Sequence, residues 1–359
     1  MAEKPLIVLT GGGTAGHIWP NLVLADTLTR NGYLLAYIGS FRGIERALVT
    51  EKALPYFPTF TGKLRRYLSW QNVADMGWVV LGILTSVFWL FRLRPTLVFS
   101  KGGFVALPTV IAAWLLRIPL ICHESDLSAG LTTKISARFS RLIAVTFPQT
   151  RELWPEKAVW TGLPIRSSIL NGNAARARVQ FHLPIGMPLV LVVGGSLGSA
   201  FLNRLLREAL PELTTQFGVV HLCGKGGMDS ALQFLHYFQF EFINAEFGDL
   251  LAAADVVVSR AGSNSVYELL AVGKPHVLIP LSKRVSRGDQ VENAQYYEAK
   301  GVSTVIDEEK ATPQRLADAV QTVFNKRDRI RQAILDLGVT DGTPRLVSLI
   351  DSVLSRKTV

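Results

Sequence analysis

Short apolar runs of strand length alternate with segments of helix length along the first half of the chain. The runs read PLIVLT, LLAYIG, TLVFSKG, PLICHES and RLIAVTF, and a helix is expected from about Pro20, after the first of them. Such alternation is typical of a parallel sheet with helices on both faces. The pattern therefore predicts a doubly wound α/β domain.

The same alternation restarts near residue 187. Its runs read PLVLVVGGSLGSAFLNRLLREAL, FGVVHLCGKG, FEFINAE, DVVVSRAGSNSVYELLA, HVLIPLS and VSTVID. The segment between, 161–187, is rich in Gly, Pro, Asn and Arg, as passages between domains are. The chain has 359 residues, and single cores rarely grow past about 250 residues. We expect an N-terminal domain over 1–164, a C-terminal domain over 165–345, and a last helix over 346–359 that packs back on the N-terminal domain.

Composition narrows the class of protein. The chain is 48% hydrophobic and 18% charged, and it carries no run of 18 uncharged apolar residues, which argues against an integral membrane protein. Lys and Arg outnumber Asp and Glu by 38 to 28, so the net charge of +10 favours an anionic partner: nucleic acid, a phosphorylated ligand or an acidic lipid surface. Cys122 and Cys223 lie in apolar runs and no signal peptide precedes the first strand, which predicts free thiols in the cytoplasm.

The first strand runs into a glycine loop, LTGGGTAGHIWP. Gly11, Gly13 and Gly16 match the spacing G-x-G-x-x-G, in which bare backbone and helix N-terminal amides suit an anionic ligand. The second strand ends AYIGSFRG without the acidic residue of dinucleotide sites, and no Lys-Ser or Lys-Thr pair follows the glycines, which excludes a Walker A loop. A tight structural turn is the alternative, but GGSLGSAFLN, in the equivalent place of the second half, favours a ligand.

A third loop, SRAGSNSVYELLAVGKP, begins another predicted helix. Gly262, Ser263 and Asn264 offer donors to a diphosphate, and Glu268, one turn into the helix, is suited to accept hydrogen bonds from a ribose diol. The alternative is that Ser263 caps the helix and Glu268 only complements its dipole.

Seven motifs occur in the order of one known family along nearly the whole chain. They read GGGTAGH, SKGGF, HESD..AGLTTK, TGLPIR, GGSLGS, SRAGSNSVYE and SRGDQVENA, and together they resemble the MurG family. The resemblance implies a GT-B fold, two Rossmann-like domains facing across a cleft. It also implies a peripheral enzyme on the cytoplasmic face of the cell membrane, which moves N-acetylglucosamine (GlcNAc) from UDP-GlcNAc to lipid I and forms lipid II for peptidoglycan.

The resemblance also implies donor-binding residues in the second half. Arg166 matches the arginine of G-x-P-[VI]-R, whose forked guanidinium suits a phosphate, and Ser196 matches the serine of the second glycine loop. Glu268 matches a ribose-binding carboxylate and Gln290 a glutamine that contacts the donor sugar. Asn293, three residues on and so on the same helix face, is a supporting neighbour, although an exposed loop–helix junction would look similar.

In the first glycine loop, Thr14, Ala15 and Gly16 fall where the family holds sugar and diphosphate. His17 is then the expected general base, since an imidazole that titrates near neutrality suits deprotonation of the acceptor C4 hydroxyl. The alternative is a structural histidine at the end of the strand. Asp126 in HESD departs from the family, several members of which have Asn there, and a carboxylate cannot donate as Asn does.

Other positions stay open at this stage. His123 either orients the cleft between the domains or is a satisfied buried histidine. The uracil site is expected near 242–244, without an assigned residue. The chain has no D-x-D motif and no carboxylates with metal-ligand spacing, so we expect no required metal and no cofactor, with Arg166 and helix N-termini neutralising charge instead.

A basic and aromatic segment offers a route to the membrane. Sixteen uncharged residues, Met76 to Phe91, are flanked by basic ones and contain aromatic residues typical of a lipid interface. The residues expected to face the membrane are Lys63, Arg65, Arg66, Trp78 and Trp89, with Arg92 and Arg94 in the second flank. The alternative is a crossover helix buried against the sheet.

Three other functions fit parts of the pattern. A UDP-GlcNAc 2-epimerase would act on the donor alone, and a glycolipid synthase on the same fold would differ in its acceptor. A non-catalytic nucleotide-sugar sensor would keep Glu268 and the glycine loops without depending on His17. The partners expected for the transferase are UDP-GlcNAc, lipid I and an anionic membrane surface, and not nucleic acid.

Overall fold

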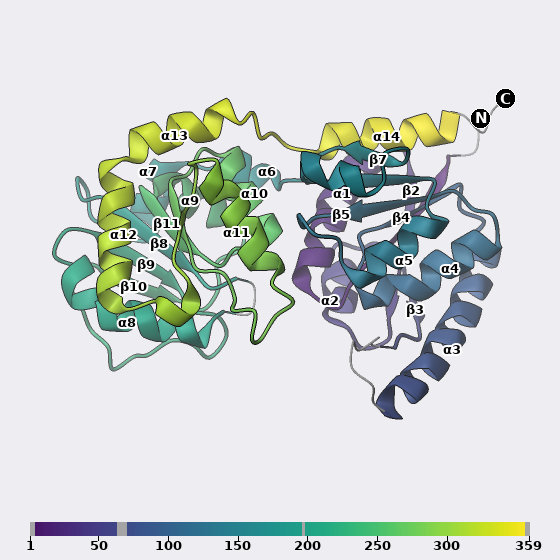
Figure 1. The fold of residues 1–359 in the computed structure, drawn as a ribbon, viewed down its shortest axis with the longest axis horizontal. Helices are drawn as coiled ribbons and strands as arrows, with labels where there is room; N and C mark the ends of the chain where they lie inside the picture. The colour runs from purple at the N-terminus through teal and green to yellow at the C-terminus, as the bar shows by residue number, and fades with distance from the viewer. Residues whose placement is uncertain (1–3, 63–69, 196–197, 356–359) are drawn as a thin grey trace. The chain divides into compact units, whose positions relative to one another are not determined.

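The structure is a computed structural model that describes residues 4–62, 70–195 and 198–355. The chain divides into two compact units, which are described separately. The first comprises Met1–Pro164 and Asp341–Val359, and the second comprises Ile165–Thr340. Figure 1 labels the elements of both.

The first unit is built on a seven-stranded sheet with the order β3-β2-β1-β4-β5-β6-β7, in which every pairing is parallel. Its strands are β1 (Leu6–Thr10), β2 (Leu34–Ser40), β3 (Tyr56–Thr59), β4 (Leu97–Ser100), β5 (Leu120–Glu124), β6 (Leu142–Val145) and β7 (Ala158–Trp160). The chain runs outward from β1 to β3 and then returns to place β4 on the other side of β1. Ligands of open parallel sheets bind at such a reversal, beyond the carboxyl ends of the strands.

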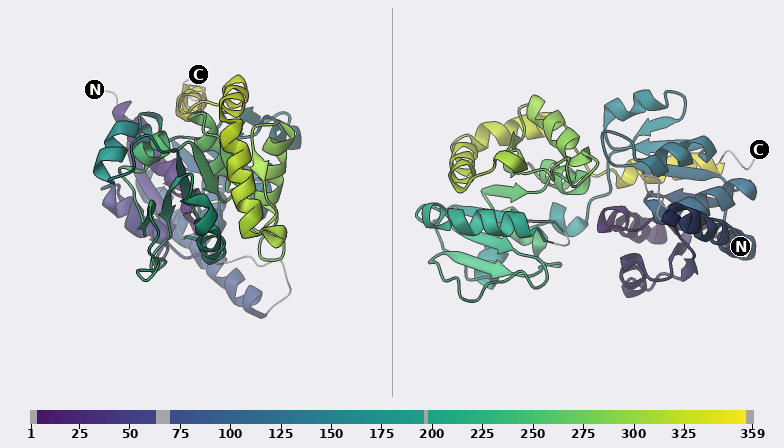
Figure 2. Two further views of the ribbon diagram at one scale, coloured as in Figure 1. Left: turned by 90° about the vertical axis from the view of Figure 1, so that its left-hand side faces the viewer. Right: turned by 60° about the horizontal axis from the view of Figure 1, so that its bottom comes forward.

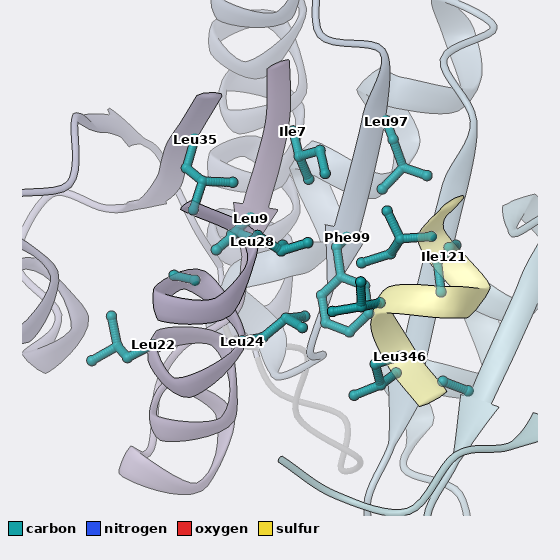
Figure 3. Packing of buried hydrophobic residues seen from close by; sticks show 14 of the residues in the cluster. Ile7, Leu9, Leu22, Leu24, Leu28, Leu35, Leu97, Phe99, Ile121 and Leu346 are labelled. Carbon is teal, nitrogen blue, oxygen red and sulfur yellow. The ribbon is translucent and has the colours of Figure 1, made fainter. Parts of the chain in front are cut away.

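Helices cover both faces of this sheet, because successive residues of a strand point to opposite sides. From β1, Ile7 and Leu9 pack into the core beneath α1 and α14 (Figure 3). Val8, between them, joins the core beneath α3 and α4. The helices are η1 (Ala15–His17), α1 (Trp19–Arg30), α2 (Ile44–Glu51), α3 (Trp70–Leu93), η2 (Phe104–Ala106), α4 (Leu107–Leu115), α5 (Leu131–Phe139), η3 (Pro148–Leu153) and α14 (Thr343–Ser355).

The C-terminal helix α14 completes the core of the first unit. Leu346 and Ile350 are fully buried in the same cluster as Leu22 and Leu28 of α1 (Figure 3). Helix α14 thus packs with β1 and α1.

The second unit repeats the architecture with a six-stranded parallel sheet of order β10-β9-β8-β11-β12-β13. Its strands are β8 (Leu189–Val193), β9 (Gly218–Leu222), β10 (Tyr237–Phe240), β11 (Val256–Ser259), β12 (His276–Leu278) and β13 (Thr304–Val305). The order reverses between β8 and β11. Two doubly wound domains, the predicted fold class, are therefore confirmed.

The second unit has a core of its own. Helices α8 and α12 pack against each other (Figures 1 and 2). Their apolar side chains share a buried cluster with those of β8, β11 and β12. The helices are α6 (Ser167–Leu170), α7 (Ala174–Gln180), α8 (Ala200–Leu213), α9 (Phe247–Ala253), α10 (Ser263–Ala271), α11 (Asp289–Ala299), η4 (Glu308–Lys310), α12 (Pro313–Asn325) and α13 (Arg327–Asp336).

Candidate functional site

The first glycine loop leaves the carboxyl end of β1 at the point where the sheet order reverses. Gly13 has φ +87°, and a Cβ there would lie 2.4 Å from the ring of Phe104, so both the backbone and the packing require glycine. Thr14 and Gly16 are exposed and Ala15 is half-buried. This loop thus brings a short exposed segment to the ligand edge of the sheet.

A carboxylate of the chain itself lies behind this loop. Glu45 is fully buried at the start of α2 and accepts hydrogen bonds from the main-chain N–H groups of Gly13 (3.4 Å) and Ser40 (3.1 Å). The expectation that the loop amides hold a ligand diphosphate therefore does not fit Gly13, because Glu45 accepts its N–H. Sequence reasoning missed Glu45, since nothing along the chain connects it with the loop. Only Thr14 to Gly16 remain as ligand-facing candidates.

His17 is the last residue of η1 and is partly exposed. Its Nδ1 lies 3.2 Å from the main-chain carbonyl oxygen of Lys101. Because a carbonyl oxygen only accepts, Nδ1 carries the proton and the lone pair belongs to Nε2. In this tautomer Nε2 is the ring nitrogen that can act as a general base.

Three charged side chains at the carboxyl ends of β4 and β5, Lys101, Glu124 and Asp126, are packed together near His17. Lys101 is 1% exposed, its ammonium donates to the Ser125 hydroxyl, and burial lowers its pKa to about 8 although Glu124 and Asp126 oppose the shift. Glu124 accepts from the N–H groups of Asp126 and Gly130, each at 3.0 Å. Burial, with Asp126 beside it, raises the pKa of Glu124. The motifs SKGGF and HESD contained these residues, but only Asp126 was singled out.

His123 is buried, as one of the two alternatives expects, but it is not fully satisfied, since no partner among the described residues pairs with its Nδ1. It is 1% exposed, and its Nε2 lies 3.0 Å from the carbonyl oxygen of Gly162. Burial and the nearby Lys101 lower its pKa well below the ordinary value, so the ring is neutral.

In the second unit, helix α10 begins at the carboxyl end of β11. Gly262 is its N-cap residue and Ser263 the first helical residue, so the alternative that Ser263 caps the helix is wrong by one position. Ser263 is buried, while Asn264 is partly exposed. A helix N-terminus with a glycine cap, next to a sheet reversal, is suited to an anionic group.

Arg166 and Glu268, 102 residues apart in sequence, form an ion pair in the second unit. The guanidinium Nε and Nη2 each lie 3.3 Å from a carboxylate oxygen, and the two side chains are 24% and 17% exposed. Arg166 also lies over the ring of Phe247, 5.4 Å from its centre. Burial raises the pKa of Glu268, and Arg166 opposes that rise. The structure thus joins two residues that the motifs singled out separately.

The remaining residues predicted to bind the donor substrate differ in burial and in hydrogen-bond partners. Gln290, near the start of α11, accepts at 3.0 Å from the N–H of Leu281. Asn293 is fully buried, so it does not face a ligand and its role is internal. Ser196 lies outside the described residues. Nearby Ser199 is the N-cap of α8, and its hydroxyl accepts from the N–H of Leu202.

Arg260 is a further residue that sequence reasoning missed. It is 8% exposed and donates to the Ser199 hydroxyl at 2.8 Å, to Glu308 at 2.6 Å and to the carbonyl of Ile279 at 3.0 Å. Its side chain therefore ties together the segments that follow β8, β11, β12 and β13. The sequence signal that could have indicated Arg260 is its place in the motif SRAGSNSVYE.

Helix α3 carries Trp78, Trp89 and Arg92, and Arg94 follows it. Lys63, Arg65 and Arg66 lie outside the described residues. Trp78 is 47% exposed. Trp89 is partly buried, and its indole donates to the Pro58 carbonyl at 3.0 Å while its ring packs on Phe57. A membrane-facing role does not fit Trp89, because its face of the helix is turned to the core.

The window Met76–Leu93 of α3 is long and apolar enough to cross a membrane by length and composition, with a mean hydropathy of 1.7 and 22% of the window buried. The uncharged run that the sequence predicts ends at Phe91, since residue 92 is an arginine. The helix itself continues past that charge.

Family models match both halves of the chain. The N-terminal domain of glycosyltransferase family 28 matches residues 7–145, and the C-terminal domain of that family matches residues 189–336. Among solved structures, the fold is shared with Acinetobacter baumannii MurG (TM-score 0.75, 24% identity, 97% of this chain and 99% of that one). It is also shared with the calicheamicin glycosyltransferase CalG4 (TM-score 0.73, 16% identity, 99% of each chain).

Curated relatives match over nearly their whole length. One from Legionella pneumophila strain Paris is 46% identical over 97% of this chain and 96% of its own, and one from Geobacillus thermodenitrificans is 43% identical over 96% and 98%. Both are named UDP-N-acetylglucosamine–N-acetylmuramyl-(pentapeptide) pyrophosphoryl-undecaprenol N-acetylglucosamine transferase. With its two Rossmann-like domains and motifs in family order, the chain belongs to the MurG family of glycosyltransferases, within glycosyltransferase family 28.

Proposed function

We propose that this protein transfers GlcNAc from UDP-GlcNAc to the C4 hydroxyl of MurNAc in lipid I, with inversion at the anomeric carbon, and so forms lipid II. The observation that carries the proposal is the 46% identity over 97% of the chain to a relative named for this reaction. Neither the Legionella nor the Geobacillus relative is named for an alternative activity, whether glycolipid synthase, UDP-GlcNAc 2-epimerase or nucleotide-sugar sensor.

The donor is held by the second unit. Glu268 accepts hydrogen bonds from the ribose diol, the α10 N-terminus and Arg166 take the diphosphate, and Gln290 contacts the sugar. The ion pair supports this division, because Arg166 opposes the burial that would protonate Glu268. When the diphosphate arrives, the Arg166 guanidinium gains a second anion, which a planar fork of five N–H donors can serve.

The acceptor reaction uses His17. As the C4 oxygen attacks the anomeric carbon, the bond from that carbon to UDP breaks and Nε2 of His17 takes the hydroxyl proton. The hydrogen bond from Nδ1–H to the Lys101 carbonyl supports this role, since it orients the ring and stabilises the imidazolium that forms.

The reaction proceeds without a divalent ion. Among the described residues, no three His, Cys, Asp or Glu side chains gather as a metal site requires, whereas Arg166 and the α10 N-terminus supply positive charge for the leaving diphosphate. Full activity is therefore expected in excess chelator, and activity that vanishes there and returns with magnesium would contradict this step.

The first unit docks on the membrane through an apolar face of α3 and α4. Its side chains are each at least 45% exposed: Met76, Trp78, Val80, Leu81, Leu84, Phe88, Phe91, Trp114 and Leu115. Arg92, Arg94 and Arg117 are exposed near one end of this face, which suits anionic lipid headgroups. The anionic partners implied by the net charge are then the membrane and the substrates, and not nucleic acid.

Helix α3 lies on the bilayer rather than across it. The opposite side of the helix is packed: Val79, Gly82, Ser86 and Leu90 are buried, and Thr59 donates to the carbonyl of Gly82 at 2.9 Å. Because α3 connects two parallel strands of one sheet and packs on α4, its inward side is already covered by protein. The enzyme is thus peripheral, on the cytoplasmic face.

Transfer of labelled GlcNAc from UDP-GlcNAc to a short-chain lipid I analogue tests the function. His17→Ala is expected to lose activity about a hundredfold or more while binding UDP-GlcNAc normally. His182→Ala, at an exposed histidine of the second unit, is the matched control and keeps full activity. A wild type that binds the donor but makes no product would overturn the acceptor assignment and favour the alternatives.

A further inference from the structure

A lysine with almost no exposed surface lies where the sheet of the first unit reverses its order. Lys101 directly follows β4, and its N–H donates at 2.9 Å to the carbonyl of Thr10 at the end of β1. A Cβ added to Gly11 would lie 3.2 Å from the Cβ of Lys101. The lysine therefore packs directly against the start of the first glycine loop.

The two polar ends of Lys101 reach two different loops. Its carbonyl oxygen accepts from Nδ1 of His17 at 3.2 Å, and its ammonium donates to the hydroxyl of Ser125. Ser125 begins the segment 125–130, whose main-chain amides at Asp126 and Gly130 are held by the Glu124 carboxylate. One residue thus connects the turn that carries the base with the loop that follows β5.

The sheet itself does not need this charge. Removing a lysine ammonium from water is unfavourable, and an unbranched apolar side chain would fill the same space without that cost. Buried charges of this kind, paired with nearby carboxylates beside a ligand edge, are typical of functional sites. Both Glu124 and Asp126 act on Lys101, which accounts for the retained charge.

We propose that Lys101 is a positioning residue for the transfer reaction, which holds the His17 imidazole and the 125–130 segment together so that the acceptor hydroxyl meets the base. The proposal rests on the function proposed above. Lys101 is too deeply buried to touch a substrate, so its removal affects the acceptor reaction through His17 and the loop, and leaves donor binding in the second unit unchanged.

The side-chain half of this link, from the ammonium to Ser125 and the two carboxylates, depends on the charge of the ammonium, whereas His17 contacts the main-chain carbonyl. The ionisable groups around it are Glu124, Asp126 and His123 from β5 and the segment after it, and His17 from η1. Because burial brings the pKa of Lys101 to about 8, the attraction to the two carboxylates weakens as the pH rises through that value. The acceptor reaction should weaken with it.

Lys101→Met in the full-length protein tests the proposal, with Lys274→Met as matched control. The pKa of Lys274 is likewise lowered to about 8 by burial, and its ammonium donates to the carbonyls of Ala252 and Ala254. Lys274 precedes β12, so it lies at the amino ends of the strands and not at the carboxyl edge where ligands bind. Two measurements are compared: hydrogen exchange over 11–17 and 125–130, and kcat/KM with lipid I analogue or UDP-GlcNAc varied.

For Lys101→Met, we expect faster exchange in both segments and at least a tenfold lower kcat/KM for the acceptor, with the donor KM within about twofold of wild type. The wild type should lose acceptor kcat/KM above about pH 8, whereas the variant has no such decline. Lys274→Met should match the wild type in both segments and in the acceptor kinetics.

Unchanged exchange in 125–130, or acceptor and donor constants that change together, would overturn the proposal. If Lys101→Met does not fold, Ser125→Ala, which keeps the lysine, must show the faster exchange in 125–130, and its absence counts against the link. If wild-type protein transfers no GlcNAc to the lipid I analogue, the proposed function fails, and the exchange comparison alone then decides whether Lys101 holds the two segments together.

Discussion

At the scale of single residues, burial decides the chemistry of the charged groups. Lys101 and Glu268 lie at the ligand edges of their sheets. Burial lowers the pKa of Lys101 and raises the pKa of Glu268, and both shifts favour the neutral form of the side chain. Groups of opposite charge oppose each of these pKa shifts. Glu124 and Asp126 act on Lys101 in the first unit, and Arg166 acts on Glu268 in the second. The charge state of each side chain therefore depends on a few charged partners, and single substitutions can test this dependence.

The stability of the wild type relative to Lys101→Met should rise with pH between about 8 and 10. A folded-state pKa of about 8 lies below the ordinary lysine value of 10.5, so in this range the unfolded chain binds more protons than the folded one. The gain is up to about 1.4 kcal/mol per pH unit. Urea unfolding of both proteins at several pH values measures it, and a constant difference would show that the buried ammonium keeps its ordinary pKa.

Arg166→Gln should raise the KM for UDP-GlcNAc by about tenfold or more, as the loss of a charge-assisted contact of about 1.5–3 kcal/mol implies. Because Arg166 opposes the rise in the pKa of Glu268, the variant should also bind donor more weakly as the pH falls. Titration of UDP-GlcNAc at two pH values measures both effects.

Arg176→Gln is the control for this substitution. It breaks another Arg–carboxylate pair of the second unit, the pair with Asp249, in which the arginine side chain is 60% exposed. Donor affinity should stay at the wild-type value. An equal loss in both variants would mean that Arg166 acts through the stability of the unit instead of through the site.

At the scale of elements, α3 serves two surfaces at once. Leu90 is 1% exposed and lies in the core of the first unit, whereas Leu84 and Phe88, on the other side of the same helix, are about 60% exposed. When a helix has one apolar face packed on protein and another exposed to solvent, the exposed face is expected to bind a second partner.

The triple substitution Leu84→Ser, Phe88→Ser and Phe91→Ser should abolish binding to vesicles that contain anionic lipid and leave the melting temperature near that of the wild type. Leu90→Ala should do the reverse, with a loss of about 2–5 kcal/mol of stability and normal binding by the folded protein. Vesicle co-sedimentation and thermal unfolding separate the two. Vesicle binding that survives the triple substitution would place the membrane contact elsewhere.

At the scale of the whole molecule, the two units have separate cores, and the first is closed by the last helix of the chain. Ile350 is fully buried among residues of β1 and α1, and Tyr33 of the first unit donates to Asp351. Helix α14 thus stabilises the unit that carries His17, while the proposed donor residues belong to the other unit.

Ile350→Ala should therefore destabilise the first unit by about 2–5 kcal/mol, because it leaves a cavity in a closed core. UDP-GlcNAc binding by the second unit should remain. Thermal unfolding with and without the nucleotide sugar distinguishes the units: the ligand should raise only the transition of the second one. A single transition that moves as a whole in both conditions would show that the units unfold together.

Local pattern by itself determined much of this protein. Apolar runs separated by helix-length segments predict the two parallel sheets, and the glycine loops with SRAGSNSVYE predict where polar chemistry gathers, because carboxyl ends of parallel strands meet at one edge. The first glycine loop and the motif SRAGSNSVYE contain His17 and Glu268, whereas Arg166 was indicated by the resemblance to the MurG family, and the order of the motifs led to that family.

Only the tertiary structure decided which groups meet. The Arg166–Glu268 pair, Glu45 behind the first glycine loop and Lys101 between His17 and Ser125 join positions that are far apart in sequence, so no local spacing announces them. It also turned Trp89 inward and left Phe88 outward, since the rotation of a helix is set by the sheet and helices on which it packs. Periodicity specifies elements, but partners and burial follow from three-dimensional packing.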